Sequence, residues 1–410
     1  MKTIQKLNSI VEVTGGTIIT PRGFKAAGIH SKVKRKRNDL GAILCDVPAS
    51  SAAVYTLNQI QAAPLQVTKE SIAEEGRLRA IVVNSGNANS CTGEQGLLDA
   101  YEMRNASAHQ FDLPEHQVAV TSTGVIGEPM PMEKVLNGIK QLEPKPAYQD
   151  AEAFNEAIMT TDKAKKHACF QTKIDGKKIT VAGTAKGSGM IHPNMATMLS
   201  FITTDAAIEP KHLQTALSEI TNKTFNRITV DGDTSTNDMV VVMASGLAEN
   251  EALQPEHPEW KTFVDALEQT SQELAKKIAR DGEGATKLVE VNVTGAASEK
   301  EAGQAAKQIV GSDLVKTAIY GTDANWGRII VALGYSEVQL NPDTIDIWLG
   351  PIQTLKQSRP VSFSEEEAKA YLEQEDITIT VDLNISGSSG KAWGCDLTYD
   401  YVRINAGYRT

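Results

Sequence analysis

Short apolar runs alternate with amphipathic stretches along most of the chain, which is the pattern of a mixed α/β or α+β protein. Three of the apolar runs lead into turns rich in Gly, Ser, Thr or Asn, at residues 84–87, 121–124 and 183–187. Polar turns at strand ends commonly carry functional groups, so we expect candidate site residues in these segments. The strands themselves are predicted at residues 80–83, 118–120, 179–181, 239–243 and 328–333.

Two long segments have the periodicity of amphipathic helices. Residues 211–225 and 260–280 each place their apolar side chains on one helical face, and Gly282 follows the second segment as a C-terminal stop. A third helix is predicted to begin at Ser364, because Glu367 follows three residues later and completes a capping box.

The C-terminal part of the chain is predicted to be rich in β-structure. Residues 377–385 alternate strictly between apolar and polar side chains, as in a half-buried strand of an antiparallel sheet, and residues 287–293 repeat the pattern over a shorter length. Residues 296–308 read as a loop followed by a helix. We therefore place a structural division near residues 281–287, followed by a C-terminal α+β domain at about 288–410.

Length, charge and cysteine content exclude several classes of protein. The 410 residues suffice for two or three domains, and the net charge of −10 argues against nucleic-acid binding, which needs a basic face. We find neither a signal peptide nor an apolar run near the ~18 residues of a membrane helix, so a cytoplasmic protein is expected. The four cysteines are far apart and form no CxxC pair, which predicts neither a zinc site nor disulfides.

Two motifs that suggest ligands do not meet the requirements of those ligands. Residues 231–238 (DGDTSTND) begin like a calcium loop, but Thr236 and Val242 stand where an EF-hand needs Gly and Glu. We interpret this segment as a turn whose short polar side chains satisfy local backbone donors and accept left-handed geometry. Residues 183–189 lack the spacing of a phosphate-binding Walker motif, and His192 is interpreted as structural.

The segment 186–204 offers a possible nucleophile. A turn rich in Gly and Ser leads through Ala196 and Thr197 into an apolar, β-branched run. The hydroxyl of Thr197 could attack the carbonyl of Ala196, and hydrolysis of the resulting ester would free Thr197 as a new N-terminus. Its α-amine, with a pKa of ~7.7–8.0, could then serve as the base for its own hydroxyl. The spacing alone favours an ordinary strand start, because most Ala-Thr pairs before a strand are nothing more.

A family resemblance favours self-cleavage at Thr197 over an ordinary strand start. HPNMATML at 192–199 resembles the cleavage motif of the ornithine acetyltransferase (ArgJ, glutamate N-acetyltransferase) family, in which the chain is cut between Ala and Thr. The resemblance covers essentially the whole chain and implies an α/β (α+β) layered sandwich similar to N-terminal-nucleophile enzymes. Further similar blocks, in the family's order, are NSGNAN at 84–89, STGVIGE at 122–128, TTD at 160–162, AKGSGM at 185–190, DGDTSTND at 231–238, DGEGATK at 281–287, GTDANWGRI at 321–329 and the tail at 398–410.

The resemblance also implies roles for single residues. Thr197 is similar to the family's acetyl-carrying nucleophile, and Thr123 and Gly124 to its oxyanion hole. Lys186 suits binding of a substrate carboxylate, and Glu283 suits binding of the side-chain ammonium of ornithine. The alternative for both residues is a solvated charge in a turn with no role in binding, which composition alone would favour. Thr161, adjacent to Thr160, fits the same substrate contact. The implied substrate-binding set is Thr160, Lys186, Thr197, Glu283, Asn405 and Thr410.

The implied reaction is transfer of acetyl from N2-acetyl-L-ornithine to L-glutamate through acetyl-Thr197, with ping-pong kinetics, in arginine biosynthesis. Acetyl-CoA is expected as a second donor, with no bound cofactor and no metal. Cleavage would give fragments 1–196 and 197–410, expected to assemble as α2β2, with partners limited to small-molecule substrates. One alternative is a self-processing N-terminal-nucleophile amidase or aminopeptidase, with water as acceptor. Another is a non-catalytic ligand-binding protein that stays uncut.

Overall fold

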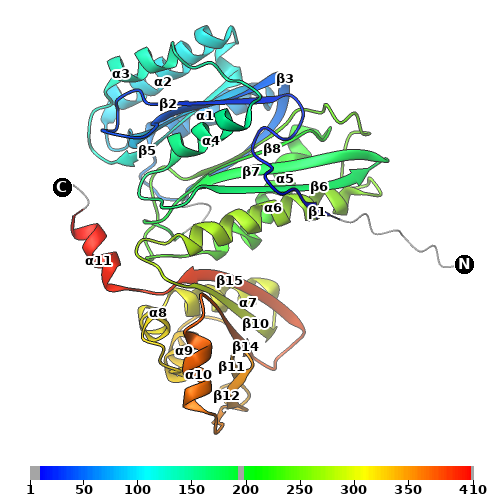
Figure 1. The fold of residues 1–410 in the computed structure, drawn as a ribbon. Helices are drawn as coiled ribbons and strands as arrows, with labels where there is room; N and C mark the ends of the chain where they lie inside the picture. The colour runs from blue at the N-terminus through cyan, green and yellow to red at the C-terminus, as the bar shows by residue number, and fades with distance from the viewer. Residues whose placement is uncertain (1–9, 193–197, 408–410) are drawn as a thin grey trace, which may run out of the picture.

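The computed structural model describes residues 10–192 and 198–407, which form two β-sheets with flanking helices (Figure 1). Within these residues the larger sheet has nine strands in the order β1-β6-β7-β8-β9-β3-β4-β5, with β2 paired to β3. Its strands are β1 (Val11–Glu12), β2 (Phe24–Ile29), β3 (Leu40–Tyr55), β4 (Arg77–Asn87), β5 (Val118–Val125), β6 (Lys166–Ile174), β7 (Lys177–Lys186), β8 (Leu199–Thr204) and β9 (Met239–Ala244). The helices of this part are α1 (Ala63–Glu75), α2 (Gly93–Phe111), α3 (Met132–Ile139), α4 (Tyr148–Ile158), α5 (Pro210–Lys223) and α6 (Trp260–Arg280), with short 3-10 turns η1 (Glu115–Gln117) and η2 (Phe225–Arg227).

The larger sheet is doubled over into two layers by its long strand β3, which pairs with β4 through its first half and with β9 through its second. Successive side chains of a strand point to opposite faces. On β9, Val242 therefore packs with α5 and α6, while Val241 meets Ile81 of β4 between the layers. On β4, Val82 faces outward and packs with α2 and α3. The result is helices, sheet, sheet and helices in sequence, which confirms the predicted mixed α/β layered sandwich.

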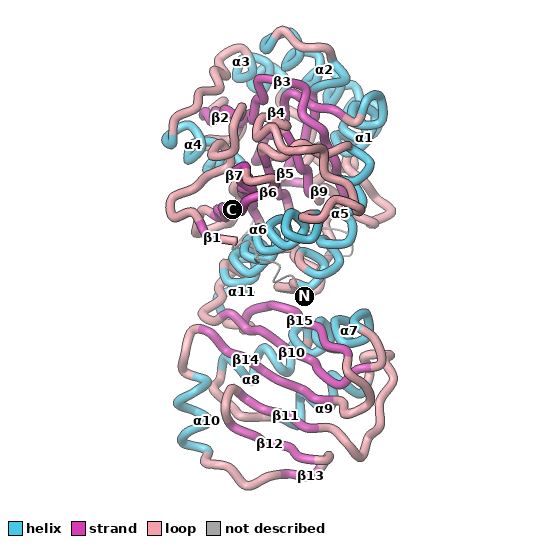
Figure 2. Tube along the Cα trace, turned by 90° about the vertical axis from the view of Figure 1, so that its right-hand side faces the viewer, coloured by secondary structure: helices cyan, strands magenta, loops and turns pink. Residues whose placement is uncertain are grey.

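A second sheet forms a separate body at the bottom of Figures 1 and 2. Among the described residues it has six strands in the order β13-β12-β11-β14-β10-β15, and it packs with its helices around its own apolar core. The strand β15 joins the two bodies, since Trp393 and Cys395 belong to the core beneath α6. The elements are β10 (Leu288–Ala296), α7 (Glu299–Gly311), α8 (Asp313–Tyr320), α9 (Trp326–Gly334), β11 (Asp346–Leu349), β12 (Ile352–Lys356), β13 (Arg359–Pro360), α10 (Glu365–Leu372), β14 (Asp376–Asp382), β15 (Ser388–Cys395) and α11 (Tyr399–Ala406).

Two sequence predictions about this second body are wrong. Residues 328–333 are not a strand but lie in α9, where Ile329, Ala332 and Leu333 are the buried face. A short apolar run does not distinguish a strand from a buried helix. The strand predicted at 377–385 is β14, but it pairs in parallel with β10 and antiparallel with β11, so the sheet is mixed. Alternation reports that one face is buried and says nothing about strand direction.

The helix predictions agree with the structure. The helix α6 spans Trp260–Arg280, α5 covers most of residues 211–225, and the Ser364 hydroxyl accepts a 3.2 Å hydrogen bond from the Glu367 amide at the start of α10. In the part of the chain that the structure describes, no helix combines the length and apolar character needed to cross a membrane.

The three polar segments predicted as turns are instead the ends of strands. The strand β4 continues to Asn87, β5 to Val125 and β7 to Lys186. Parallel pairing of β4 with β5 sets Ser85 beside Thr123 and Gly86 beside Gly124. Antiparallel pairing of β7 with β8 sets Lys186 beside Leu199. These registers bring polar strand ends together at one edge of the sandwich.

Candidate active site

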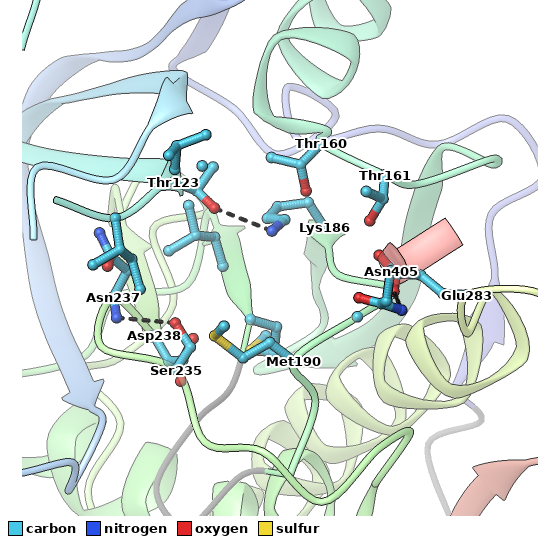
Figure 3. Close-up of a pocket in the computed structure, with 16 residues that line it drawn as sticks. Thr123, Thr160, Thr161, Lys186, Met190, Ser235, Asn237, Asp238, Glu283 and Asn405 are labelled. Atoms are coloured by element: carbon cyan, nitrogen blue, oxygen red, sulfur yellow. Dashed lines mark hydrogen bonds between the residues drawn. The ribbon is translucent and has the colours of Figure 1, made fainter. Parts of the chain in front are cut away.

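A cavity of about 340 Å³ lies where these strand ends meet (Figure 3). This volume is in the range of small-molecule sites. Its walls come from both layers of the sandwich, from the segment after α6 and from α11. The lining residues are Thr123, Gly124, Val125, Ile126, Thr160, Thr161, Lys186, Gly189, Met190, Met198, Leu199, Ser235, Asn237, Asp238, Glu283 and Asn405.

Thr123 and Gly124 form the wall contributed by β5. Gly124 has a φ of +138°, and a Cβ there would lie 2.4 Å from the carbonyl carbon of Gly86, so this close strand contact requires glycine. The Oγ1 of Thr123 accepts a 3.1 Å hydrogen bond from the Nζ of Lys186. Because that contact uses an oxygen lone pair, the hydroxyl hydrogen of Thr123 stays available for donation to another group.

Lys186 ends β7 and is the one cation among the described residues that line the cavity, whereas Asp238 and Glu283 supply carboxylates. It is buried, and burial lowers the pKa of its ammonium, opposed by the nearby carboxylates of Asp162, Asp238 and Glu283 and assisted by the cation of Lys166. A buried ammonium beside an open cavity can bind an anionic substrate group at little further desolvation cost.

Glu283 forms the opposite wall and is only 7% exposed. Its amide donates to the carbonyl of Ser188 at 2.9 Å, and a Cβ at Gly189 would lie 2.4 Å from its carboxylate. Glycine at 189 is therefore what leaves room for this side chain. The Nδ2 of Asn405 donates to its Oε2 at 2.7 Å, so α11 reaches back from the second body to the cavity.

Thr160 and Thr161 follow α4 and both line the cavity. The amide of Thr160 donates to Oδ2 of Asp162 at 2.9 Å, and Oγ1 of Thr161 shares a 2.8 Å hydrogen bond with Oγ of Ser188. The geometry leaves either threonine as the substrate contact.

Three predicted site residues, Ala196, Thr197 and Thr410, lie outside the described residues. Met198, the next residue after Thr197, lines the cavity, and its carbonyl accepts a 3.0 Å hydrogen bond from the amide of Met239. The chain therefore enters β8 at the cavity wall. Six further predicted residues, Thr123, Gly124, Thr160, Lys186, Glu283 and Asn405, come from distant parts of the sequence and line this same cavity.

Sequence reasoning missed the wall formed by Ser235, Asn237 and Asp238. These residues belong to the segment 231–238, which we interpreted as a turn and matched to a family block without assigning it any site residue. Asn237 ties the neighbouring blocks together, since its Nδ2 donates to the carbonyls of Ala88 at 2.5 Å and Ser122 at 2.8 Å. The available signal was a run of short polar residues directly before a fully apolar strand.

At the start of the same segment, Oδ1 of Asp231 accepts a 3.4 Å hydrogen bond from the amide of Asp233, which is a local backbone donor as predicted, and Asp231 also bonds amides that are distant in the sequence. The carboxylate of Asp231 accepts hydrogen bonds from the amides of Met190 at 2.7 Å and Ile191 at 2.8 Å. Within residues 10–192 and 198–407, no group of three or more His, Cys, Asp or Glu side chains is placed to hold a metal ion.

Comparison with known proteins identifies relatives over the full length of the chain. Residues 25–410 match the ArgJ family. The arginine biosynthesis bifunctional protein ArgJ of Halalkalibacterium halodurans is 67% identical over 411 residues, and that of Geobacillus kaustophilus is 62% identical over 410 residues, in both cases covering 100% of each chain. A crystal structure of arginine biosynthesis bifunctional protein ArgJ from Bacillus halodurans is 73% identical with a TM-score of 0.51, and covers 52% of this chain and 100% of the crystallised one.

These matches confirm the resemblance inferred from the motifs. The family match spans more than nine-tenths of the sequence, and relatives above 60% identity align from end to end. The chain therefore belongs to the ArgJ family of arginine-biosynthesis enzymes and is an acyltransferase.

Proposed function

We propose that the protein is a self-cleaved N-acetyltransferase that moves acetyl from N2-acetyl-L-ornithine to L-glutamate through an ester on Thr197. One observation carries the proposal. Thr123, Lys186 and Glu283 surround a single small-molecule cavity whose wall includes Met198, the residue bonded to Thr197. This arrangement supports placing the proposed nucleophile, oxyanion donors and substrate-binding charges at one cavity.

The charges of the cavity suit this donor. N2-acetyl-L-ornithine carries a carboxylate and a side-chain ammonium at its two ends. The ammonium of Lys186 would bind the carboxylate, and the carboxylate of Glu283, oriented by Asn405, would bind the substrate ammonium. The acetylated nitrogen lies beside the carboxylate-bearing carbon, so its carbonyl would approach Thr123, which is hydrogen-bonded to Lys186.

The chemical steps then follow. The free α-amine of Thr197 takes the proton of its own hydroxyl, and the oxygen attacks the acetyl carbonyl. The hydroxyl of Thr123 and the backbone amide of Gly124 would stabilise the resulting oxyanion, and one such donor is worth about 2.7–4 kcal/mol. Collapse breaks the carbon–nitrogen bond, the proton passes to the departing amine, and ornithine leaves. The amine of glutamate then attacks the ester and restores the Thr197 hydroxyl.

Cleavage would divide the chain into fragments 1–196 and 197–410. The crystallised relative supports this, because its whole chain corresponds to 52% of this one, and residues 197–410 are also just over half of the 410. The fragments would stay together, since β8 of the second pairs with β7 of the first, and β9 of the second pairs with β3 of the first. We propose α2β2 as their assembly and residues 288–410 as the C-terminal domain.

We propose acetyl-CoA as the second acetyl donor, acting on the same Thr197, with no bound cofactor. The relatives at 62–67% identity are named bifunctional, which supports a second activity. Acetylation by acetyl-CoA would use the same oxyanion donors and would not require Glu283, because the thioester lacks the ornithine ammonium.

Mass spectrometry of the purified protein with and without N2-acetyl-L-ornithine tests the proposal. We expect two fragments, with the mass of one acetyl group added to the C-terminal one, and parallel lines in double-reciprocal plots with glutamate. Release of acetate without transfer to glutamate would instead identify an amidase. A single uncut chain that gains no acetyl would identify a ligand-binding protein.

A further inference from the structure

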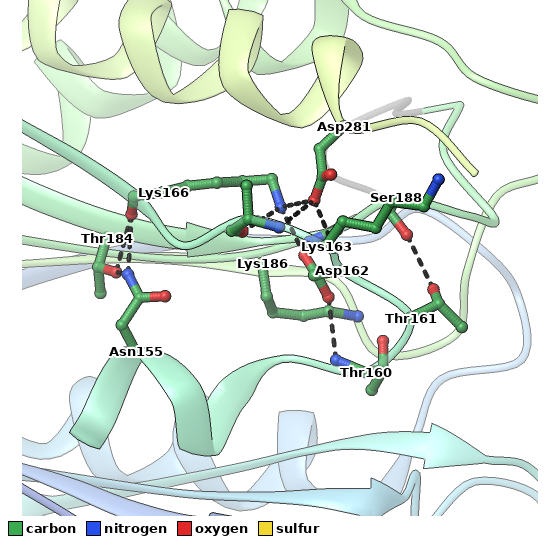
Figure 4. A network of polar contacts seen from close by, with 12 residues as sticks. Asn155, Thr160, Thr161, Asp162, Lys163, Lys166, Thr184, Lys186, Ser188 and Asp281 are labelled. Carbon is green, nitrogen blue, oxygen red and sulfur yellow. Dashed lines mark hydrogen bonds and ion pairs between the residues drawn. The ribbon is translucent and has the colours of Figure 1, made fainter. Parts of the chain in front are cut away.

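Beneath the cavity lies a buried group of charged side chains that the proposed mechanism does not use (Figure 4). Lys166, the first residue of β6, has a side chain that is only 1% exposed. Its Nζ donates to Oδ1 of Asp162 at 2.7 Å and to Oδ2 of Asp281 at 2.6 Å. One ammonium between two carboxylates leaves a net negative charge, and burial of such a group is costly unless its hydrogen bonds are satisfied.

The carboxylate of Asp162 is the member that reaches the cavity walls. Besides Lys166, its Oδ1 accepts from the amide of Gly187 at 2.7 Å and its Oδ2 from the amide of Thr160 at 2.9 Å. Burial raises the pKa of Asp162, but the cations of Lys166 and Lys186 outweigh this effect and lower the pKa to about 2. The carboxylate is therefore charged at every working pH, and it fixes the backbone at Thr160 and at Gly187, the residue after Lys186.

Asp281 joins the opposite wall to the same lysine. It caps the end of α6, two residues before Glu283, and its Oδ2 also accepts from the amides of Lys163 at 3.1 Å and Ala164 at 3.3 Å. After burial, the strongest effects on the pKa of Lys186 come from Asp162, Asp238, Lys166 and Glu283, in that order, so Asp281 acts on Lys186 more weakly than Asp162 does. Asp162 and Asp281 thus share Lys166 but differ in the strength of their electrostatic effect on Lys186.

We propose that Asp162 is a positioning residue that keeps Lys186 charged and in place for the substrate carboxylate, with Lys166 and Asp281 holding Asp162 itself. This inference rests on the proposed function, in which Lys186 binds the donor's carboxylate. Burial favours the neutral amine of Lys186, and Asp162 is the strongest of the groups that oppose this effect. Without that carboxylate, Lys186 would lose its proton at a lower pH, and donor binding would fail there.

The test is the pH profile of kcat/KM for N2-acetyl-L-ornithine in the Asp162→Asn variant. Asparagine keeps the size and one of the two acceptor oxygens but removes the charge. We expect the alkaline limb to move about one pH unit lower, so that kcat/KM above the limb falls about tenfold, with a smaller change below it. The matched control is Asp281→Asn, which removes the other carboxylate on Lys166 and should leave the limb in place. Asp162→Glu should restore it.

A second readout separates this inference from the proposed function. The titration of Lys186 can be followed by ¹³C NMR at its ε-carbon, with the signal assigned by its loss in Lys186→Met. A lower pKa in Asp162→Asn, but not in Asp281→Asn, supports the inference whether or not acetyl transfer is found. An unchanged titration, or equal shifts in both variants, overturns it even if wild-type protein transfers acetyl as proposed.

A further variant covers the case in which Asp162→Asn does not fold. The double variant Asp162→Asn with Lys166→Met removes both members of the buried ion pair and leaves the group with the same net negative charge as in wild type, now carried by Asp281. Since Asp162 acts on Lys186 more strongly than Lys166 does, we still expect a lower pKa for Lys186. A wild-type titration in this variant would also overturn the inference.

Discussion

The two walls of the cavity are held in different ways. The wall with Thr160 and Lys186 rests on buried charges, with the side chains of Lys166 and Asp162 at 1% and 0% exposure. The wall completed by Asn405 rests on α11, a helix with no buried residue among those described, whose Tyr399 is 80% exposed. The first wall is part of the folded core, whereas α11 adds the outer part of the second wall, beside the buried Glu283, at the surface.

Because the two walls are held differently, changes in them should affect stability and catalysis to different degrees. Changes in the buried wall should alter folding and substrate binding together, because its charges have no access to water. The surface wall is attached by a few hydrogen bonds, from Thr398 to the Gly284 carbonyl, from Tyr401 to Asp231 and from Asn405 to Glu283. Changes there should alter catalysis with little effect on folding.

Thr197→Ala removes the group that both walls serve and should have the largest effect. We expect an uncut chain on a denaturing gel and no acetyl transfer, because the variant lacks the hydroxyl for both steps. The melting temperature should stay near that of wild type. Two fragments with normal turnover in this variant would refute the central role of Thr197.

Deleting residues 405–410 tests the surface wall. We expect turnover to be abolished, since Asn405 and the predicted contact Thr410 are both lost, while thermal unfolding stays close to wild type. Activity assays and a melting curve on the same sample check both halves. A truncated protein that fails to fold would show that α11 belongs to the core after all.

Asp162→Ala tests the buried wall. Loss of its carboxylate leaves the buried Lys166 without one of its two partners, and we expect destabilisation of about 3–5 kcal/mol in chemical unfolding. The native pKa of about 2 lies below the ~3.9 of an unfolded Asp, so this carboxylate stabilises the fold above pH ~4. The deficit of the variant should shrink as the pH falls from ~4 toward 2. A deficit that grew in acid would contradict the assignment.

Asn405→Ala should have the smallest effect. It removes the 2.7 Å hydrogen bond to Glu283, and a hydrogen bond to a charged group is worth about 1.5–3 kcal/mol. We expect a roughly tenfold or greater rise in KM for N2-acetyl-L-ornithine and an unchanged melting temperature. Acetylation of glutamate by acetyl-CoA is the internal control, since that donor carries no ornithine ammonium. An equal loss with both donors would show a general structural role.

The sequence by itself determined the elements whose signal is local. The amphipathic helix Trp260–Arg280 and the Ser364 cap are found as expected, because side-chain periodicity and capping are properties of neighbouring residues. The motifs also pointed to Thr123, Lys186 and Glu283. Short apolar runs were less informative, and the strand expected at 328–333 is the helix α9.

Only the tertiary structure decided what those residues share. Lys166 and Asp281 are 115 positions apart in the sequence, so no local pattern could reveal the ion pair that joins Asp281 to Lys166 and Asp162. The cavity wall at Asp238 and the parallel pairing of β10 with β14 likewise depend on how distant strands meet. Periodicity reports which face of an element is buried, whereas the identity of its partner is set by packing of the whole chain.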